Sequence, residues 1–196
     1  AVKGLGRGFI RAIEEQRQKN GKFTGLEDFC SRMLPAGLQK QTLDSLIRCG
    51  ALDGLGLNRR QMLEYQEQIL ADCRDVRSSI VTGQMNLFGG DESQSVPMNH
   101  IPLLPEYDQA HLLQLEHDSM GLYLSGHPLE QTTWLRQLCH AQDAAALRER
   151  KDGERVLLIV MVQNIKQHTT KQGDTMCFLT CEDQSGTADC VVFPSL

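Results

Sequence analysis

The chain has 196 residues, a net charge of −5 and only 5% aromatic residues, so it has room for one or two small domains with mainly aliphatic cores. No apolar run approaches the ~20 residues that cross a bilayer, and the first residues lack the apolar stretch of a signal peptide, which argues against a membrane partner. The seven cysteines stand at irregular spacings, which favours reduced thiols in the cytoplasm over a disulfide framework or a metal site.

Residues 1–76 are predicted to form an all-α region. Apolar side chains recur there at helical spacing in several short stretches that begin at capping residues or end at glycines. This region also carries the positive charge, because residues 1–74 hold 12 basic and 9 acidic side chains, whereas residues 75–150 hold 4 and 10. The charge pattern permits a nucleic-acid contact only in this first region.

Three glycine-containing loops precede helices in this region, at residues 4–6, 35–39 and 53–58. Two glycines at a helix start let the backbone and its free N–H groups approach a phosphate, and basic flanks add attraction. The pattern predicts a tandem helix–hairpin–helix arrangement that lacks the leading helix of its first unit. The alternative is a set of tight turns with a purely structural role. The expected DNA contacts are Lys3, Gly4, Leu5, Gly6, Arg7, Gly37, Gln39, Lys40, Arg59 and Arg60.

After residue 76 the composition and the side-chain periodicity divide the chain into three further segments. Residues 77–105 are rich in Ser, Gly, Asn and Pro and are predicted to form a flexible linker, and residues 106–150 are predicted to form a helical connector. Residues 151–196 contain three β-rich runs separated by turn signals, which indicates a three-stranded meander. The predicted fold class is therefore α+β and multidomain, with an incomplete all-β part at its end.

The linker contains the stretch "TGQMNLFGG", residues 82–90. Apolar side chains between closely spaced glycines fit neither a core strand nor a helix. Such a segment favours binding to a partner, and the alternative is a loop that folds back on its own domain.

The sequence offers no catalytic set. Its six histidines do not form a metal-binding pair with an intervening Glu, and no nucleophile elbow, phosphate-binding loop or paired carboxylates are present. Catalysis by these residues is therefore not expected.

Five segments, in this order, resemble the C-terminal half of the family C replicative polymerases, the alpha subunits of bacterial DNA polymerase III. They are "VKGLGRGFIRAIEEQR", "KFTGLEDFCSR", "LDSLIRCGALDGLGLNRRQML", "LEHDSMGLYLSGHPL" and "GDTMCFLTCEDQSGTADCVVFP". The resemblance spans nearly the whole chain, and "GLYLSGHPL" is its most specific part.

The resemblance implies a tandem helix–hairpin–helix domain that holds duplex DNA, followed by an OB-fold associated with single-stranded template. It also implies an internal peptide that docks on the sliding clamp, matched here by Gln84, Met85, Asn86, Leu87 and Phe88. Lys166, His168, Lys171 and Phe178 are the expected contacts to single-stranded DNA. The family's catalytic palm is absent, so no cofactor is expected in these residues, and Mg²⁺ belongs to that missing domain.

Two other functions stay open at this point. A helix–hairpin–helix repair protein such as a glycosylase would need a catalytic Asp or Lys in a base-flipping pocket. A clamp-binding interaction protein would have no affinity for DNA.

Overall fold

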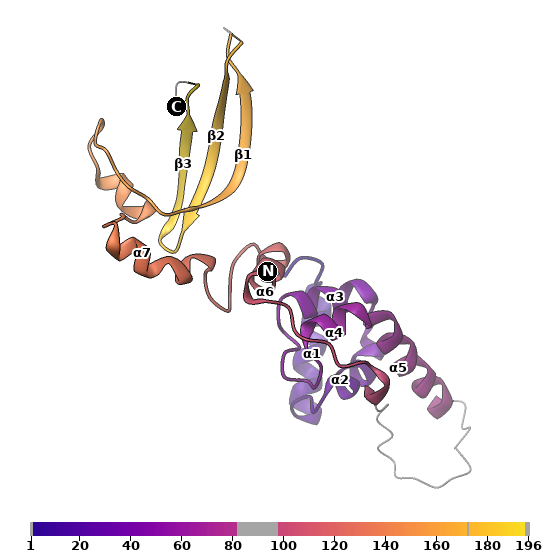
Figure 1. The fold of residues 1–196 in the computed structure, drawn as a ribbon. Coiled ribbons are helices and arrows are strands. Elements are labelled where there is room, and N and C mark those ends of the chain that lie inside the picture. Colours follow the sequence, from indigo (N-terminus) through magenta and orange to yellow (C-terminus); the bar gives the residue numbers. More distant parts are fainter. Residues whose placement is uncertain (1, 82–97, 172, 195–196) are drawn as a thin grey trace. The chain divides into compact units, whose positions relative to one another are not determined.

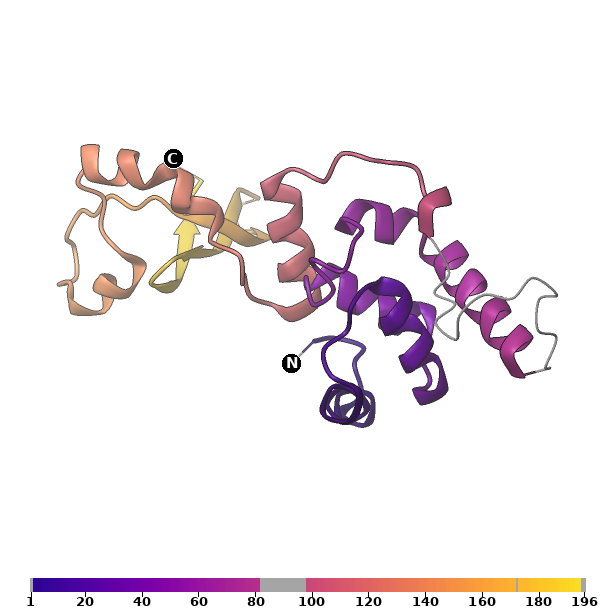
Figure 2. The same cartoon turned by 90° about the horizontal axis from the view of Figure 1, so that it is seen from below.

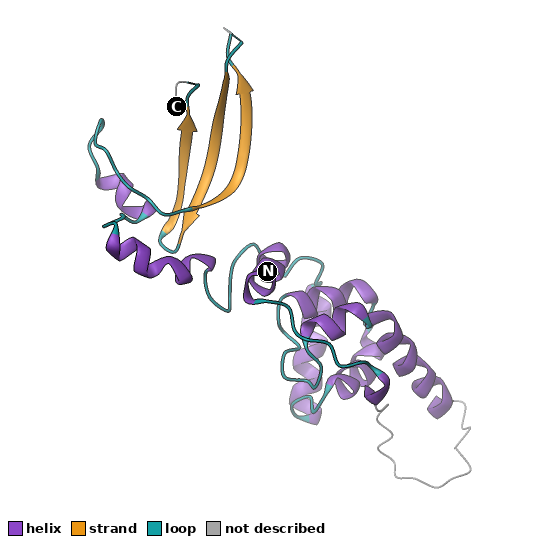
Figure 3. Cartoon of the chain, viewed as in Figure 1, coloured by secondary structure: helices purple, strands orange, loops and turns teal. Residues whose placement is uncertain are grey.

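The computed structural model describes residues 2–81, 98–171 and 173–194 and divides into two compact units, Ala1–Leu124 and Ser125–Leu196 (Figure 1). Among the described residues, unit 1 is built from helices, and all three strands belong to unit 2 (Figure 3). The predicted α+β class is therefore confirmed. The expected helical connector, residues 106–150, contributes to both units.

The helices of unit 1 begin and end near capping residues and glycines. They are, in chain order, α1 (Arg7–Asn20), α2 (Leu26–Met33), the 3-10 helix η1 (Leu34–Ala36), α3 (Lys40–Arg48), α4 (Arg59–Glu64), α5 (Gln66–Val81), η2 (Met98–His100) and α6 (Gln109–Met120). The helical periodicity after Asn58 corresponds to two helices, because Tyr65 separates α4 from α5. α5 then continues into the expected linker.

The core of unit 1 is mainly aliphatic, as the composition predicts. Its largest fully buried apolar side chains come from α2 through α5: Leu26, Phe29, Met33, Leu43, Ile47, Met62, Ile69 and Leu70. Burying each such side chain contributes about 1.5–3 kcal/mol. Because short helices are marginal by themselves, this packing holds α2 to α5 in place.

An extended segment, residues 101–108, runs back along unit 1 from η2 to α6 (Figures 1 and 2). Two side chains at the start of α4 hold it: Asn58 Nδ2 donates to the Leu104 carbonyl at 2.7 Å, and Gln61 Nε2 donates to the Pro102 carbonyl at 2.8 Å. The N–H of Lys3 donates to the Ser119 carbonyl at 2.8 Å, which fixes the first residues against the end of α6.

Unit 2 contains a three-stranded antiparallel sheet in the order β1-β2-β3. Its elements are η3 (Pro128–Thr132), α7 (Thr133–Leu138), η4 (Ala144–Glu149), β1 (Met161–Thr169), β2 (Thr175–Asp183) and β3 (Gly186–Val192). The predicted meander is therefore confirmed, with a register shift in β1 between Val162 and Asn164.

Asp183 ties the β2–β3 turn to η4. Its carboxylate accepts hydrogen bonds from the N–H of Ala144 at 2.8 Å, the N–H and hydroxyl of Ser185 at 2.8 and 2.6 Å, and the N–H of Gly186 at 3.1 Å. Burial by itself would raise the pKa of Asp183, but these hydrogen bonds to the charged form outweigh it and lower the pKa. The ionised carboxylate is thus part of the fold.

Candidate nucleic-acid interface

Three loops of unit 1 share one conformation and one residue pattern. We call residues 4–7, 37–40 and 56–59 the first, second and third loop. Each opens with a glycine of positive φ, at 81°, 91° and 109° respectively, followed by a leucine that packs toward the core. The next residue is extended and caps a helix, and the helix then begins with Arg or Lys. The predicted repeat therefore recurs three times in the backbone.

The first loop leaves the start of α1 open. Gly6 caps α1 without a side-chain hydrogen bond, and the first turn of α1 contains no acidic residue. A Cβ built at Gly6 would meet no atom within 4 Å, whereas one at Gly4 would lie 3.0 Å from Ser45 Oγ. Gly4 is thus needed for the turn, and Gly6 keeps the approach to the N–H groups clear. Those groups and the helix dipole favour an anion there.

The second loop also leaves its helix start open, because the Gln39 side chain accepts no hydrogen bond from the first N–H groups of α3 and the first turn has no acidic residue. Lys40 is paired with Glu67, both exposed, and the hydrogen bond from Lys40 lowers the pKa of Glu67. Part of the charge predicted for this loop is therefore already balanced by α5.

Two arginines that the sequence reasoning missed lie beside the second loop. A groove of about 520 Å³ is lined by Gly37, Gln39, Arg74 and Arg77 among others. Both arginines are exposed, and within the described residues neither makes an ion pair. Their spacing of three on α5 signals a shared helix face, but it is the packing of α5 on α2 and α3 that brings that face to the loop.

The third loop, from which Arg59 and Arg60 were expected to contact DNA, is closed by a carboxylate. The Glu106 carboxylate accepts hydrogen bonds from the N–H of Arg59 at 2.8 Å and from the N–H of Arg60 at 3.1 Å. Asn58 and Gln61 complete a capping box. The position that a phosphate would take at this helix start is therefore filled by a carboxylate of the chain itself.

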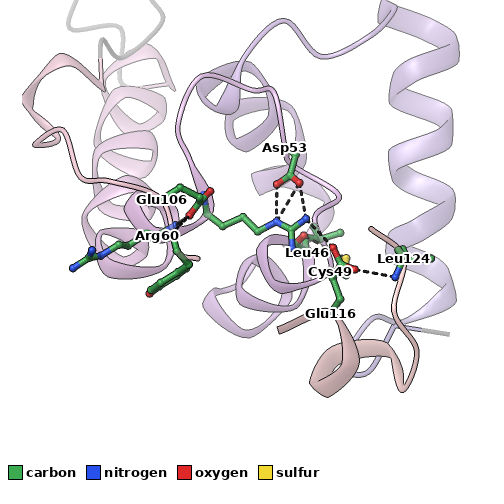
Figure 4. Close-up of polar contacts among 9 residues, drawn as sticks. Leu46, Cys49, Asp53, Arg60, Glu106, Glu116 and Leu124 are labelled. Atoms are coloured by element: carbon green, nitrogen blue, oxygen red, sulfur yellow. Dashed lines mark hydrogen bonds and ion pairs between the residues drawn. The ribbon is translucent and has the colours of Figure 1, made fainter. Parts of the chain in front are cut away.

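The side chain of Arg59 is buried in an ion-pair cluster, and its partners Asp53 and Glu116 are labelled in Figure 4. Its guanidinium contacts Asp53 at 2.6 Å and Glu116 at 3.1 Å, and the other oxygen of Glu116 accepts a hydrogen bond from the N–H of Leu124 at 2.9 Å. The hydrogen bond to Asp53, followed by that to Glu116, raises the pKa of Arg59. Arg59 thus fastens α6 to the third loop. The Arg60 guanidinium is held by Glu64 at 2.9 Å.

The residues expected to contact single strands gather on one face of the sheet in unit 2. Lys166, Phe178 and Val191 form one row across β1, β2 and β3, and Phe178 is 44% exposed. His168 lies two residues further on the same face, because side chains alternate along a strand. Lys171 is exposed in the turn after β1. A cation beside an exposed ring is typical of stacking platforms for bases.

The expected clamp-binding peptide, Gln84–Phe88, lies outside the described residues. Among the described residues, no group of three or more His, Cys, Asp or Glu side chains could hold a metal ion. The same part of the chain contains no helix that is long and apolar enough to cross a membrane.

The sequence comparisons agree with this geometry. Residues 1–62, which contain all three loops, match the family described as helix-hairpin-helix motif. Over 98% of its length, the chain is 34% identical to the DNA polymerase III subunit alpha of Deinococcus radiodurans, 33% to that of Pseudomonas aeruginosa and 32% to that of Thermus aquaticus. The chain is therefore similar, over nearly its whole length, to DNA polymerase III alpha subunits.

The match covers a limited part of these relatives. The chain spans 15%, 18% and 16% of the three polymerase subunits, respectively. The resemblance stated from the five sequence segments is thus confirmed, and residues 1–62 of the chain carry a helix–hairpin–helix motif. This result favours the replicative family over the repair-protein alternative.

Proposed function

We propose that this part of the polymerase family binds duplex DNA through the sugar–phosphate backbone, with the first and second loops as the contacts. The observation that carries the proposal is the contrast among three loops of one conformation. The third loop is closed by Glu106, whereas the helices after the first two loops have no side-chain cap and no acidic residue in their first turn. Arg7, Arg74 and Arg77 supply positive charge beside the open loops. Such contacts bind any sequence and weaken with salt.

Fluorescence anisotropy of a labelled DNA duplex, titrated with the 196-residue chain and its variants, tests this proposal. Arg7→Ala removes a cation from an open loop and should lower the salt slope of binding by about one. Arg60→Ala removes a cation from the closed loop and is the matched control, with an affinity within about twofold of wild type. Gly6→Val should weaken binding without unfolding, because its Cβ meets no atom. Equal affinities for Arg7→Ala and Arg60→Ala would contradict the assignment.

The proposal includes a second contact, to the sliding clamp, through Gln84–Phe88. Its support is the sequence pattern: Leu87 and Phe88 are adjacent apolar anchors, and Gln84 is a polar group that can bond at a pocket rim. A third contact is assigned to the face with Lys166 and Phe178, where single-stranded template would stack. Together these contacts would hold template and clamp near the catalytic domain of a replicative polymerase.

A further inference from the structure

A cavity of about 330 Å³ lies between α1, α2 and the loop of residues 51–55. Its floor is hydrocarbon, formed by Ile13, Phe23, Phe29, Leu46, Leu52 and Leu55. The volume is at the lower end of the range of about 300–1,000 Å³ found for ligand sites. It therefore suits one large apolar side chain.

The wall of the cavity is held in place before any ligand binds. The rings of Phe23 and Phe29 pack edge to face with centroids 5.0 Å apart, and the Arg32 guanidinium lies 4.2 Å from the Phe23 ring centroid. Phe29 and Leu52 are at most 2% exposed. A ligand that enters would not have to order these side chains, which reduces the cost of binding.

The mouth of the cavity is positively charged. Arg17 and Lys22 line it, both are exposed, and within the described residues neither makes an ion pair. The acidic residue of the lining, Asp53, accepts three hydrogen bonds from Arg59 at 2.6–3.1 Å, and Arg59 is also shared with Glu116, so the charge of Asp53 is only partly compensated. The cavity thus presents an apolar floor beside two available cations.

We propose that this cavity binds an acidic peptide segment of a partner protein, which inserts one Leu, Met or Phe side chain while its carboxylates face Arg17 and Lys22. Nucleic acid fits less well, because a base entering a hydrocarbon floor loses its hydrogen bonds to water without replacement. This site is independent of the DNA and clamp contacts proposed above.

The test uses the whole 196-residue chain and a fluorescein-labelled heptapeptide with one phenylalanine among aspartates and glutamates. Anisotropy should show saturable binding on the order of 100 micromolar or tighter. A matched peptide with alanine in place of phenylalanine should bind about tenfold more weakly. Arg17→Ala and Lys22→Ala should each weaken binding about threefold, whereas Lys19→Ala, on the same last turn but outside the cavity, should not.

Ala51→Trp provides a second test, because Ala51 lines the cavity. Its side chain is exposed, so the substitution leaves the buried core side chains unchanged. Its indole should occlude the site and abolish binding while the melting temperature stays within a few degrees of wild type. Binding of the two peptides with equal affinity, or unchanged binding in Ala51→Trp, would overturn the proposal. So would displacement of the peptide by duplex DNA, since the surface would then belong to the DNA contact.

Discussion

Replacing Glu116 by alanine removes one partner from the buried ion-pair cluster. The Glu116 side chain is 1% exposed and accepts hydrogen bonds from Arg59 and from the N–H of Leu124, at 3.1 and 2.9 Å. In Glu116→Ala the Leu124 N–H loses this acceptor, and Asp53 is the ion-pair partner that the described residues still offer to the Arg59 guanidinium, whose side chain is 6% exposed. We expect unit 1 to lose stability, because a buried charge is then poorly compensated.

The magnitude follows from the remaining partner. Removing one member of a buried ion pair costs about 3–5 kcal/mol when the other charge is left alone. Asp53 still contacts Arg59 but is 48% exposed, so its attraction is weakened by solvent. The free energy of unfolding is therefore expected to fall by about 3 kcal/mol, the lower end of this range. This corresponds to a fall of roughly 10 °C in the melting temperature.

Urea unfolding followed by far-UV circular dichroism measures this loss. Glu64→Ala is the matched control, because it removes an exposed carboxylate from Arg60, the neighbour of Arg59, and should cost less than about 0.5 kcal/mol. If the free energies of unfolding of Glu116→Ala and Glu64→Ala differ by less than about 1 kcal/mol, the reasoning about the buried cluster is refuted.

The remaining predictions concern unit 2 and the clamp peptide. Because the folded pKa of Asp183 is lowered, its stabilisation is present above the unfolded pKa of about 3.9 and is lost as the pH falls through the folded pKa. The melting temperature of wild type should therefore fall more steeply in acid than that of Asp183→Asn, and parallel curves would contradict this. Phe88→Ala should weaken surface binding to a bacterial sliding clamp by about 2 kcal/mol, roughly thirtyfold, whereas Asn86→Ala should change it little. Phe178→Ala should weaken binding of a single-stranded oligonucleotide by about 1–3 kcal/mol, and a loss no larger than that of Thr180→Ala would remove Phe178 from the site.

Local sequence patterns were sufficient to predict the elements whose structure depends on residues close together in the chain. The helix starts after the first and second loops follow from a glycine of positive φ and a capping position a few residues later, and these were predicted. The meander follows from alternating residues and short turns, and it forms as predicted. Turn chemistry and side-chain periodicity act over a few residues, so the sequence displays them directly.

The tertiary structure alone decided which loops are open. The third loop carries the same local pattern as the other two, yet Glu106, 47 residues from Arg59, occupies its helix start. Glu116, 57 residues away, turns Arg59 from an expected phosphate ligand into a buried structural cation. Arg74 comes beside the second loop only through the packing of α5. The start of a helix favours any anion that lies close to its free N–H groups. Tertiary packing decides whether a carboxylate of the same chain lies there, and the residues next to the loop in the sequence do not show it.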